Sequence, residues 1–88
     1  MAWTIEFDRR AVRDLQALDR AVQRRMLSYL EQRIAPAENP RDFGEALTST
    51  FTGLWRYRVG DYRIVSRIED DRLVVLIVRI GHRRDVYR

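Results

Sequence analysis

Residues 54–65 decide the fold, and they read Leu-Trp-Arg-Tyr-Arg-Val-Gly-Asp-Tyr-Arg-Ile-Val. Alternating polar and apolar residues on both sides of Gly60-Asp61 are typical of two β-strands joined by a tight turn. Because successive strand residues point to opposite faces, Arg56 and Arg58 share one face and the residues between and beside them share the other. The stretch therefore predicts a β-hairpin with one apolar face and one arginine-bearing face.

The N-terminal part of the chain predicts a strand followed by two helices. We expect the strand over Trp3–Phe7 and the helices over residues 9–18 and 20–34, with Asp8 and Asp19 as their N-caps. The helices share an apolar stripe at three- and four-residue spacing, which we expect to lie on a sheet. Its members are Val12, Leu15, Leu18, Val22, Met26, Leu30 and Ile34.

The remaining chain predicts a loop and three strands. Prolines stop the second helix and open a loop from Pro36 through about Thr52. The expected strands are Leu54–Val59, Tyr62–Glu69 and Arg72–Ile80. Leu73–Val78 is apolar on both faces and is expected to be a central strand. The order β-α-α-β-β-β predicts the α+β class, an antiparallel sheet packed against a helical hairpin, in one domain over residues 1–88.

Composition excludes several classes of protein. The chain has 88 residues, which leaves room for one domain. It has no cysteine, so disulfides, thiolate metal sites and cysteine nucleophiles are excluded, and its single histidine, His82, excludes a histidine-rich metal centre. The first ten residues lack the apolar core of a signal peptide, and no run reaches membrane-spanning length. We therefore expect a cytoplasmic domain that uses no metal or cofactor.

The positive charge lies in one half of the sequence. All 17 basic residues are arginine; residues 1–53 hold eight arginines and eight acids, whereas residues 54–88 hold nine arginines and five acids, which accounts for the net charge of +4. A guanidinium stays protonated and matches the geometry of phosphate. The C-terminal half therefore predicts a surface for a polyanion, although coding bias explains an absence of lysine and an acidic protein would fit the same surface.

Two clusters are candidates for chemistry. The hairpin contributes Arg56, Arg58 and Arg63, and the final segment, residues 81–88, contributes His82, Arg83 and Tyr87. If the final segment folds back over the sheet, the two clusters meet in one concave basic site. Most of these residues also have a purely structural interpretation. Asp61 or Glu69 could neutralise an arginine of the hairpin, Arg63 could form a cross-strand ion pair, His82 could be a surface histidine, and Tyr87 could simply pin the C-terminus.

Residues 53–65 and 80–87 together resemble the RelE/ParE toxin superfamily, the toxins of type II toxin–antitoxin systems. The resemblance implies a microbial ribonuclease fold without bound metal. For the RelE branch it implies a protein that enters the ribosomal A site and cuts the mRNA codon there. The RNA's own 2′-hydroxyl attacks the adjacent phosphate and leaves a 2′,3′-cyclic phosphate and a 5′-hydroxyl.

The resemblance also implies roles for five residues. Arg56 and Arg58 occupy strand positions where some relatives have lysine, and Arg63 fits a phosphate-binding arginine. Arg83 fits the arginine that stabilises or protonates the leaving group, and Tyr87 fits the tyrosine that stacks on a base or orients the nucleophile.

Arginine cannot release its proton near neutral pH, so Arg56 and Arg58 cannot replace a lysine as general base. His82 has the only side chain with an ordinary pKa of about 6.5. We therefore expect His82 to supply acid–base function, unless water or a ribosomal group does so.

Two other functions fit the same sequence. ParE-type toxins share the fold but inhibit DNA gyrase, and the ending with Arg83 and Tyr87 favours the RelE branch over them. A non-catalytic module that binds RNA or protein would also use an arginine-rich sheet. Either toxin requires a cognate antitoxin, and the basic surface favours an acidic or amphipathic helix as that partner.

Overall fold

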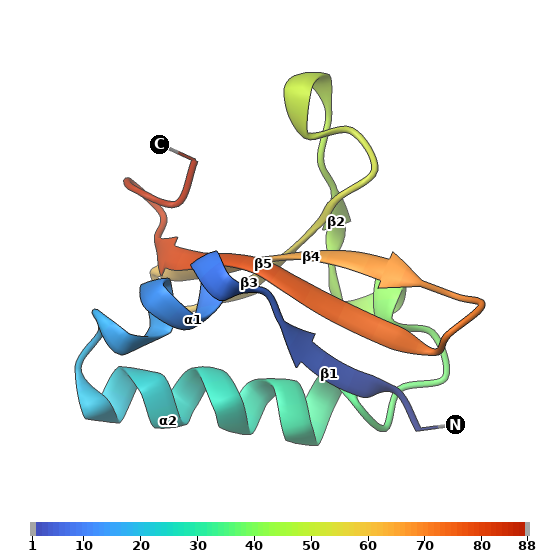
Figure 1. The fold of residues 1–88 in the computed structure, drawn as a ribbon, viewed down its shortest axis with the longest axis horizontal. Helices are drawn as coiled ribbons and strands as arrows, with labels where there is room; N and C mark the ends of the chain where they lie inside the picture. The colour runs from blue at the N-terminus through green and yellow to red at the C-terminus, as the bar shows by residue number, and fades with distance from the viewer. Residues whose placement is uncertain (1, 88) are drawn as a thin grey trace.

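The computed structural model describes residues 2–87 and consists of a five-stranded sheet with two helices on one face (Figure 1). The strand order is β1-β5-β4-β3-β2. The elements are β1 (Thr4–Phe7), α1 (Arg9–Gln16), α2 (Arg20–Tyr29), a π-helical turn (Leu30–Ile34), a 3-10 turn (Pro40–Phe43), β2 (Glu45–Ala46), a second 3-10 turn (Ser49–Phe51), β3 (Trp55–Val59), β4 (Tyr62–Glu69) and β5 (Val74–His82). The α+β class predicted from the sequence is confirmed.

The sheet is mixed rather than wholly antiparallel. The strands β3, β4 and β5 form the expected antiparallel meander. However, β1 pairs with β5 in parallel, from Thr4 opposite Val74 to Phe7 opposite Ile77. Residue alternation fixes which side chains share a face but does not encode strand direction, and the long helical connection after β1 permits either direction. The prediction that the last strand is a central one is confirmed, because β5 lies between β1 and β4.

The core lies between the helices and one face of the sheet. Met26, Leu30 and Ile34 pack against Tyr57 and Ile64, and each of the five is at most 1% exposed. The predicted stripe is wrong at its first member. Val12 is 39% exposed, and the neighbouring Ala11 is fully buried instead. The small Ala11 side chain allows α1 to approach the sheet closely. The spacing of apolar residues in the sequence could not tell whether Ala11 or Val12 faces the sheet.

The helix ends differ in how they are capped. The carboxylate of Asp8 accepts a hydrogen bond from the backbone N–H of Ala11, as a side-chain N-cap does. Asp19 precedes α2 without a side-chain capping bond. The second helix ends in the π-helical turn, in which the N–H of Ala35 donates to the carbonyl oxygen of Leu30, and Pro36 prevents its continuation.

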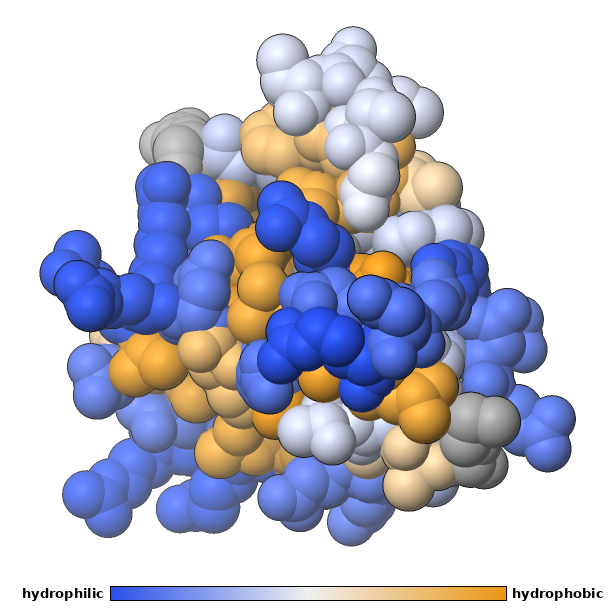
Figure 2. Space-filling model, turned by 45° about the vertical axis from the view of Figure 1, so that its right-hand side comes forward, coloured by the Kyte–Doolittle hydropathy of each residue, from blue (hydrophilic) through white to orange (hydrophobic). Residues whose placement is uncertain are grey.

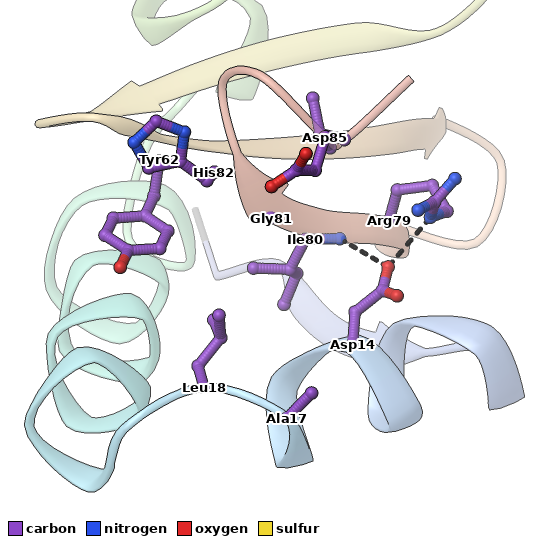
Figure 3. A pocket seen from close by; sticks show the side chains of 10 residues that line it. Asp14, Ala17, Leu18, Tyr62, Arg79, Ile80, Gly81, His82 and Asp85 are labelled. Carbon is purple, nitrogen blue, oxygen red and sulfur yellow. Dashed lines mark hydrogen bonds and ion pairs between the residues drawn. The ribbon is translucent and has the colours of Figure 1, made fainter. Parts of the chain in front are cut away.

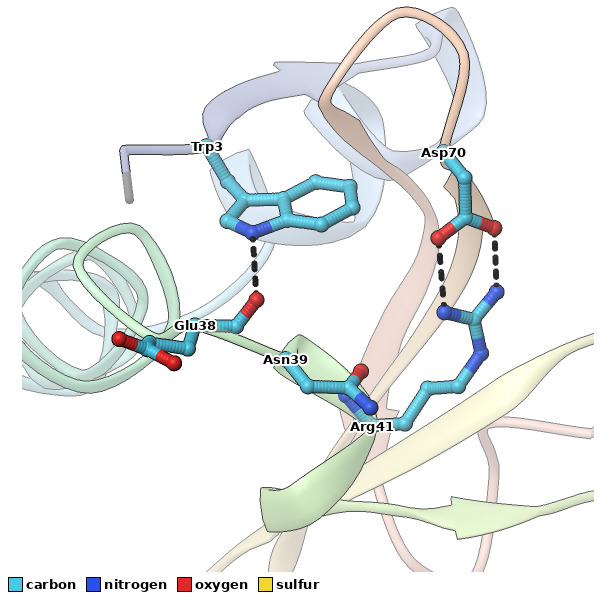
Figure 4. Close-up of polar contacts among 5 residues, drawn as sticks. All are labelled: Trp3, Glu38, Asn39, Arg41 and Asp70. Carbon is cyan, nitrogen blue, oxygen red and sulfur yellow. Dashed lines mark hydrogen bonds and ion pairs between the residues drawn. The ribbon is translucent and has the colours of Figure 1, made fainter.

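The connection after the helices is held against the sheet by polar contacts (Figure 4). Trp3 Nε1 donates to the carbonyl oxygen of Glu38 at 3.4 Å. The guanidinium of Arg41 donates to both carboxylate oxygens of Asp70, at 2.9 and 2.7 Å. The expected loop thus contains ordered turns and the short edge strand β2, and these contacts fix where that strand meets β3.

No helix among residues 2–87 is long and apolar enough to cross a membrane.

Candidate nucleic-acid interface

The sheet face turned away from the helices carries Arg56, Arg58 and Arg63, which we call the arginine face. Tyr57 and Val59, which alternate with the first two arginines, are buried in the core, so the predicted division of the β3 faces is confirmed. Arg58 and Arg63 are direct partners in the β3–β4 register. Like charges placed opposite each other destabilise a sheet. Among the residues that the structure describes, Arg63 therefore has no cross-strand ion pair, which was the structural interpretation offered for it.

Arg63 is the most enclosed charge of this face. It is 8% exposed, and its Nη1 donates to the carbonyl oxygens of Gly60 and Tyr62, each at 2.9 Å. Burial, followed by the nearby positive charges of Arg58, Arg56 and Arg83, lowers the pKa of Arg63. The guanidinium is thus held in one place by the β3–β4 turn, and within residues 2–87 it has no anionic partner.

Arg56 joins three segments of the chain. Its Nη2 lies 3.3 Å from the carboxylate of Glu45 on β2, and its Nη1 lies 3.5 Å from the hydroxyl of Tyr87, the outer limit of a hydrogen bond. Its pKa is raised, first by the contact with Tyr87 and also by Glu45. The Nε–H of Arg56 is buried without a hydrogen-bond partner among the described residues. One donor of this guanidinium therefore lacks an acceptor while the neighbouring side chains shield it from solvent.

The final segment folds back at the end of β5, with Val86 buried and backbone hydrogen bonds closing the turn. Val86 is 1% exposed and lies over Gly81, where an added Cβ atom would be 3.5 Å from the Cα of Val86. The N–H groups of Asp85 and Val86 both donate to the carbonyl oxygen of His82, at 2.8 and 3.0 Å. This tight turn reverses the chain after β5. It meets the condition under which the two basic clusters were expected to form one site.

The turn places Arg83 and Tyr87 beside the arginine face. The N–H of Arg83 donates to the carbonyl oxygen of Asp61 at 2.8 Å, and its Nε lies 3.9 Å from the Asp61 carboxylate. Its charge is close enough to contribute to the lowered pKa of Arg63. Tyr87, which is 37% exposed, reaches Arg56. Five of the six predicted site residues therefore lie together: Arg56, Arg58, Arg63, Arg83 and Tyr87.

His82 is the exception. It is a strand residue paired with Tyr62, whose ring packs against the core on the helix side of the sheet. The two rings meet edge to face with centroids 5.6 Å apart, and the Nδ1 atom of His82 accepts a hydrogen bond from the N–H of Arg84 at 3.2 Å. The structure thus separates His82 from the arginine face, on the other side of the sheet.

A cavity of about 230 Å³ lies on that other side, between the end of α1, β5 and the final segment (Figure 3). Leu18 and Ile80 contribute apolar surface to it. Asp14 points into it, where its Oδ2 accepts hydrogen bonds from Arg79 Nε at 2.8 Å and from the N–H of Ile80 at 3.0 Å. The Asp14 carboxylate thus accepts hydrogen bonds from the part of β5 that extends past its pairing with β1. The arginine face remains the better candidate for binding a polyanion.

Two contacts of the arginine face were not predicted from the sequence. The carboxylate that meets Arg56 is Glu45 rather than Asp61 or Glu69, because the short strand β2 brings Glu45 opposite Arg56. Phe51 packs against Tyr87, with ring centroids 5.3 Å apart. Neither residue stands in a distinctive motif, although Phe51 is the only aromatic residue of residues 44–54. Within residues 2–87, no group of three His, Cys, Asp or Glu side chains is arranged to hold a metal ion.

Comparison with known proteins identifies the family. Residues 5–87 match the family described as "ParE toxin of type II toxin-antitoxin system, parDE". Toxin RelG of Mycobacterium tuberculosis is 31% identical over 88 residues, which cover 100% of this chain and 99% of that protein. Toxin RelE of the same organism is 33% identical over 78 residues, covering 89% of this chain and 78% of that protein.

A solved structure gives the same result. The toxin–antitoxin complex RelBE2 from Mycobacterium tuberculosis contains a chain that is 27% identical, with a TM-score of 0.86, covering 93% of this chain and 99% of that chain. The protein described here belongs to the RelE/ParE family of type II toxin–antitoxin toxins.

Proposed function

We propose that this toxin is a metal-independent endoribonuclease of the RelE type, which cuts mRNA in the ribosomal A site. The observation that carries this proposal is the convergence of arginines and a tyrosine from β3, β4 and the final segment on one sheet face. Such a cluster is costly for the fold because its charges repel one another, so a ligand that neutralises them is the simplest reason for it. A phosphodiester is the ligand whose shape and charge arginine matches best.

The reaction assigned to this face is an internal transfer at phosphorus. The ribose 2′-oxygen forms a bond to the adjacent phosphorus and loses its proton, and the bond to the 5′-oxygen breaks as that oxygen gains a proton. Negative charge gathers on the phosphoryl oxygens between these events. Fixed cationic donors stabilise that charge, and removal of one such donor costs about 10²–10³ in rate.

The arginines divide this work according to their exposure. Arg63, enclosed and held by two backbone carbonyls, is preorganised to bind the scissile phosphate. Arg56, whose side chain is 28% exposed, supplies a second guanidinium for another phosphoryl oxygen. Arg58 is exposed beside Arg63 and adds charge. We assign Arg83, which is also exposed, to the leaving 5′-oxygen and Tyr87 to stacking on a base of the codon.

His82 is proposed to act through the final segment rather than on the substrate. Its carbonyl oxygen and its Nδ1 atom accept hydrogen bonds from the turn that carries Arg83 and Tyr87. A positioning role predicts that His82→Gln lowers the cleavage rate without altering its pH profile. An acid–base role predicts that the same variant changes the shape of the pH profile as well as the rate.

A second candidate is inhibition of DNA gyrase, which is favoured by the family match to ParE toxins. A third, a non-catalytic binding module, would use the same arginine face. For the two toxin functions we propose a cognate antitoxin as partner, because the solved relatives include toxin–antitoxin complexes.

The experiment that tests the proposal combines purified toxin, ribosomes programmed with a defined A-site codon, and a ribosome-free control, with the mRNA ends mapped. Ribosome-dependent cuts that leave a 2′,3′-cyclic phosphate support the RelE-type activity. Intact mRNA together with inhibited gyrase in a parallel supercoiling assay overturns it in favour of the second candidate. Inactivity in both assays leaves the binding module, which RNA binding without cleavage would identify.

A further inference from the structure

An uncharged hairpin stands beside the arginine face. Residues 47–54 read Leu-Thr-Ser-Thr-Phe-Thr-Gly-Leu, eight residues without a charge in a chain in which 34% of residues are charged. The segment projects from the sheet on the same side as the turn that follows β5 (Figure 1) and forms the pale, weakly polar tip at the top of Figure 2. Its four hydroxyl groups, on Thr48, Ser49, Thr50 and Thr52, can each donate and accept hydrogen bonds.

This hairpin has a defined structure at its base and its tip. The N–H of Leu47 donates to the carbonyl oxygen of Leu54 at 2.9 Å, which closes the two arms directly beyond the pairing of β2 with β3. At the tip, the Oγ1 of Thr52 donates to the carbonyl oxygen of Ser49 at 2.7 Å. The position of Phe51 relative to the sheet is therefore set by the fold.

Phe51 connects the hairpin to the proposed reactive site. Its ring lies 5.3 Å from that of Tyr87 at an angle of 57°, and the hydroxyl of Tyr87 lies 3.5 Å from Arg56 Nη1. Tyr87 is thus held at one end by a guanidinium and along its ring by Phe51, while 37% of its surface stays exposed. A centroid distance of 5.3 Å leaves no space for a base between the two rings.

We propose that the hairpin, residues 47–54, is the element that selects the nucleotide next to the scissile phosphate, with Phe51 as the residue that positions Tyr87. The inference rests on the proposed RNA cleavage. Phe51 backs one side of Tyr87, and a base stacks on the exposed side. The uncharged, hydroxyl-bearing tip is assigned to the edge of that base, where its hydroxyl groups can both donate and accept hydrogen bonds. Phosphate binding and base selection are thereby divided between the arginine face and the hairpin.

The test compares Phe51→Ala and Phe51→Trp with a matched control, Phe43→Ala. Phe43 is also aromatic and is 44% exposed, but lies in the turn before β2. The readout is kcat/KM for ribosome-dependent cleavage of a panel of A-site codons that differ at one base, with thermal unfolding measured for each variant.

Base–aromatic stacking is worth about 1–3 kcal/mol, so Phe51→Ala is expected to lower kcat/KM on the preferred codons by roughly 5- to 150-fold and to flatten the preference. Phe51→Trp is expected to retain activity with a changed preference, and Phe43→Ala to match the wild type. An unchanged ratio between codons in Phe51→Ala overturns the inference even if the overall rate falls, since Phe51 is then only structural. Intact mRNA with the wild-type toxin overturns the proposed cleavage and the inference together.

Discussion

Truncation of Val86 tests whether one buried side chain holds the final segment in place. Val86→Ala deletes two methyl groups from a side chain that is 1% exposed. Their transfer free energy is ~1.6 kcal/mol, and the residual cavity raises the cost to ~2–3 kcal/mol. Because 1.4 kcal/mol is a factor of ten, we expect the equilibrium between docked and undocked final segment to shift by roughly 30- to 150-fold.

This cost falls on the segment rather than on the whole fold, because Val86 lies beyond the last strand. The measurement is amide hydrogen exchange at Arg83 and Val86, whose N–H groups donate to Asp61 and His82 when the segment is docked. Their exchange is expected to accelerate while the thermal unfolding midpoint changes little, and cleavage is expected to fall with docking.

The matched control is Val75→Ala, the same truncation at a fully buried position in β5. It is expected to lower the unfolding midpoint of the whole domain and to leave docking of the final segment unchanged at low temperature. The reasoning is refuted if Val86→Ala leaves exchange at Arg83 and Val86 unaltered, or if both variants lower the midpoint equally.

Three further predictions concern the fold that supports the site. Burial raises the pKa of Tyr57 to about 12, above its ordinary value of 10.0. The folded state therefore gains up to roughly 3 kcal/mol from keeping this phenol neutral, a contribution that is complete below pH 10 and is lost as the pH rises through 12. In chemical denaturation, Tyr57→Phe should lose less stability than the wild type as the pH is raised. The Arg41 guanidinium lowers the pKa of Asp70 below its ordinary value of 3.8. Their ion pair therefore stabilises the fold above pH 3.8, and this contribution is lost as the pH falls through the lowered pKa. Asp70→Asn should make the free energy of unfolding depend less on pH in the acid range. A Cβ atom on Gly44 would lie 3.0 Å from a carbonyl oxygen of β3, whereas one on Gly81 would meet its nearest atom at 3.5 Å; Gly44→Ala should therefore cost ~1–3 kcal/mol in urea unfolding and Gly81→Ala much less.

Most of the regular structure could be predicted from local pattern. The strand Tyr62–Glu69 and the turn at Gly60 lie where alternation and turn chemistry placed them. The division of β3 into an arginine-bearing and an apolar face also followed from alternation, because a strand has only two faces. A helix can be rotated about its axis by small steps, so the sequence specifies its buried face less sharply. The predicted apolar stripe consequently began at Val12 instead of Ala11.

The contacts around the site depend on tertiary structure and were harder to predict. Glu45 and Phe51 reach the arginine face because an unpredicted two-residue strand pairs with β3. His82 was expected to follow the last strand, but β5 continues through it, so strand alternation turns its ring to the helix side. The fold-back of the final segment was predicted only as a condition; in the structure the burial of Val86 and the backbone hydrogen bonds to His82 and Asp61 hold it.

The most direct test of the account compares Arg58→Met with Arg24→Met in single-turnover cleavage on programmed ribosomes. Both arginines are exposed, but Arg58 lies on the arginine face and Arg24 on α2 at the other side of the sheet. If the arginine face stabilises charge during phosphoryl transfer, Arg58→Met slows cleavage by roughly tenfold at saturating toxin, which corresponds to about 1.4 kcal/mol of lost stabilisation from an exposed charge. Arg24→Met should stay within about threefold of the wild type, as for a solvated charge. Equal rates for the two variants would contradict the assignment of catalysis to the arginine face.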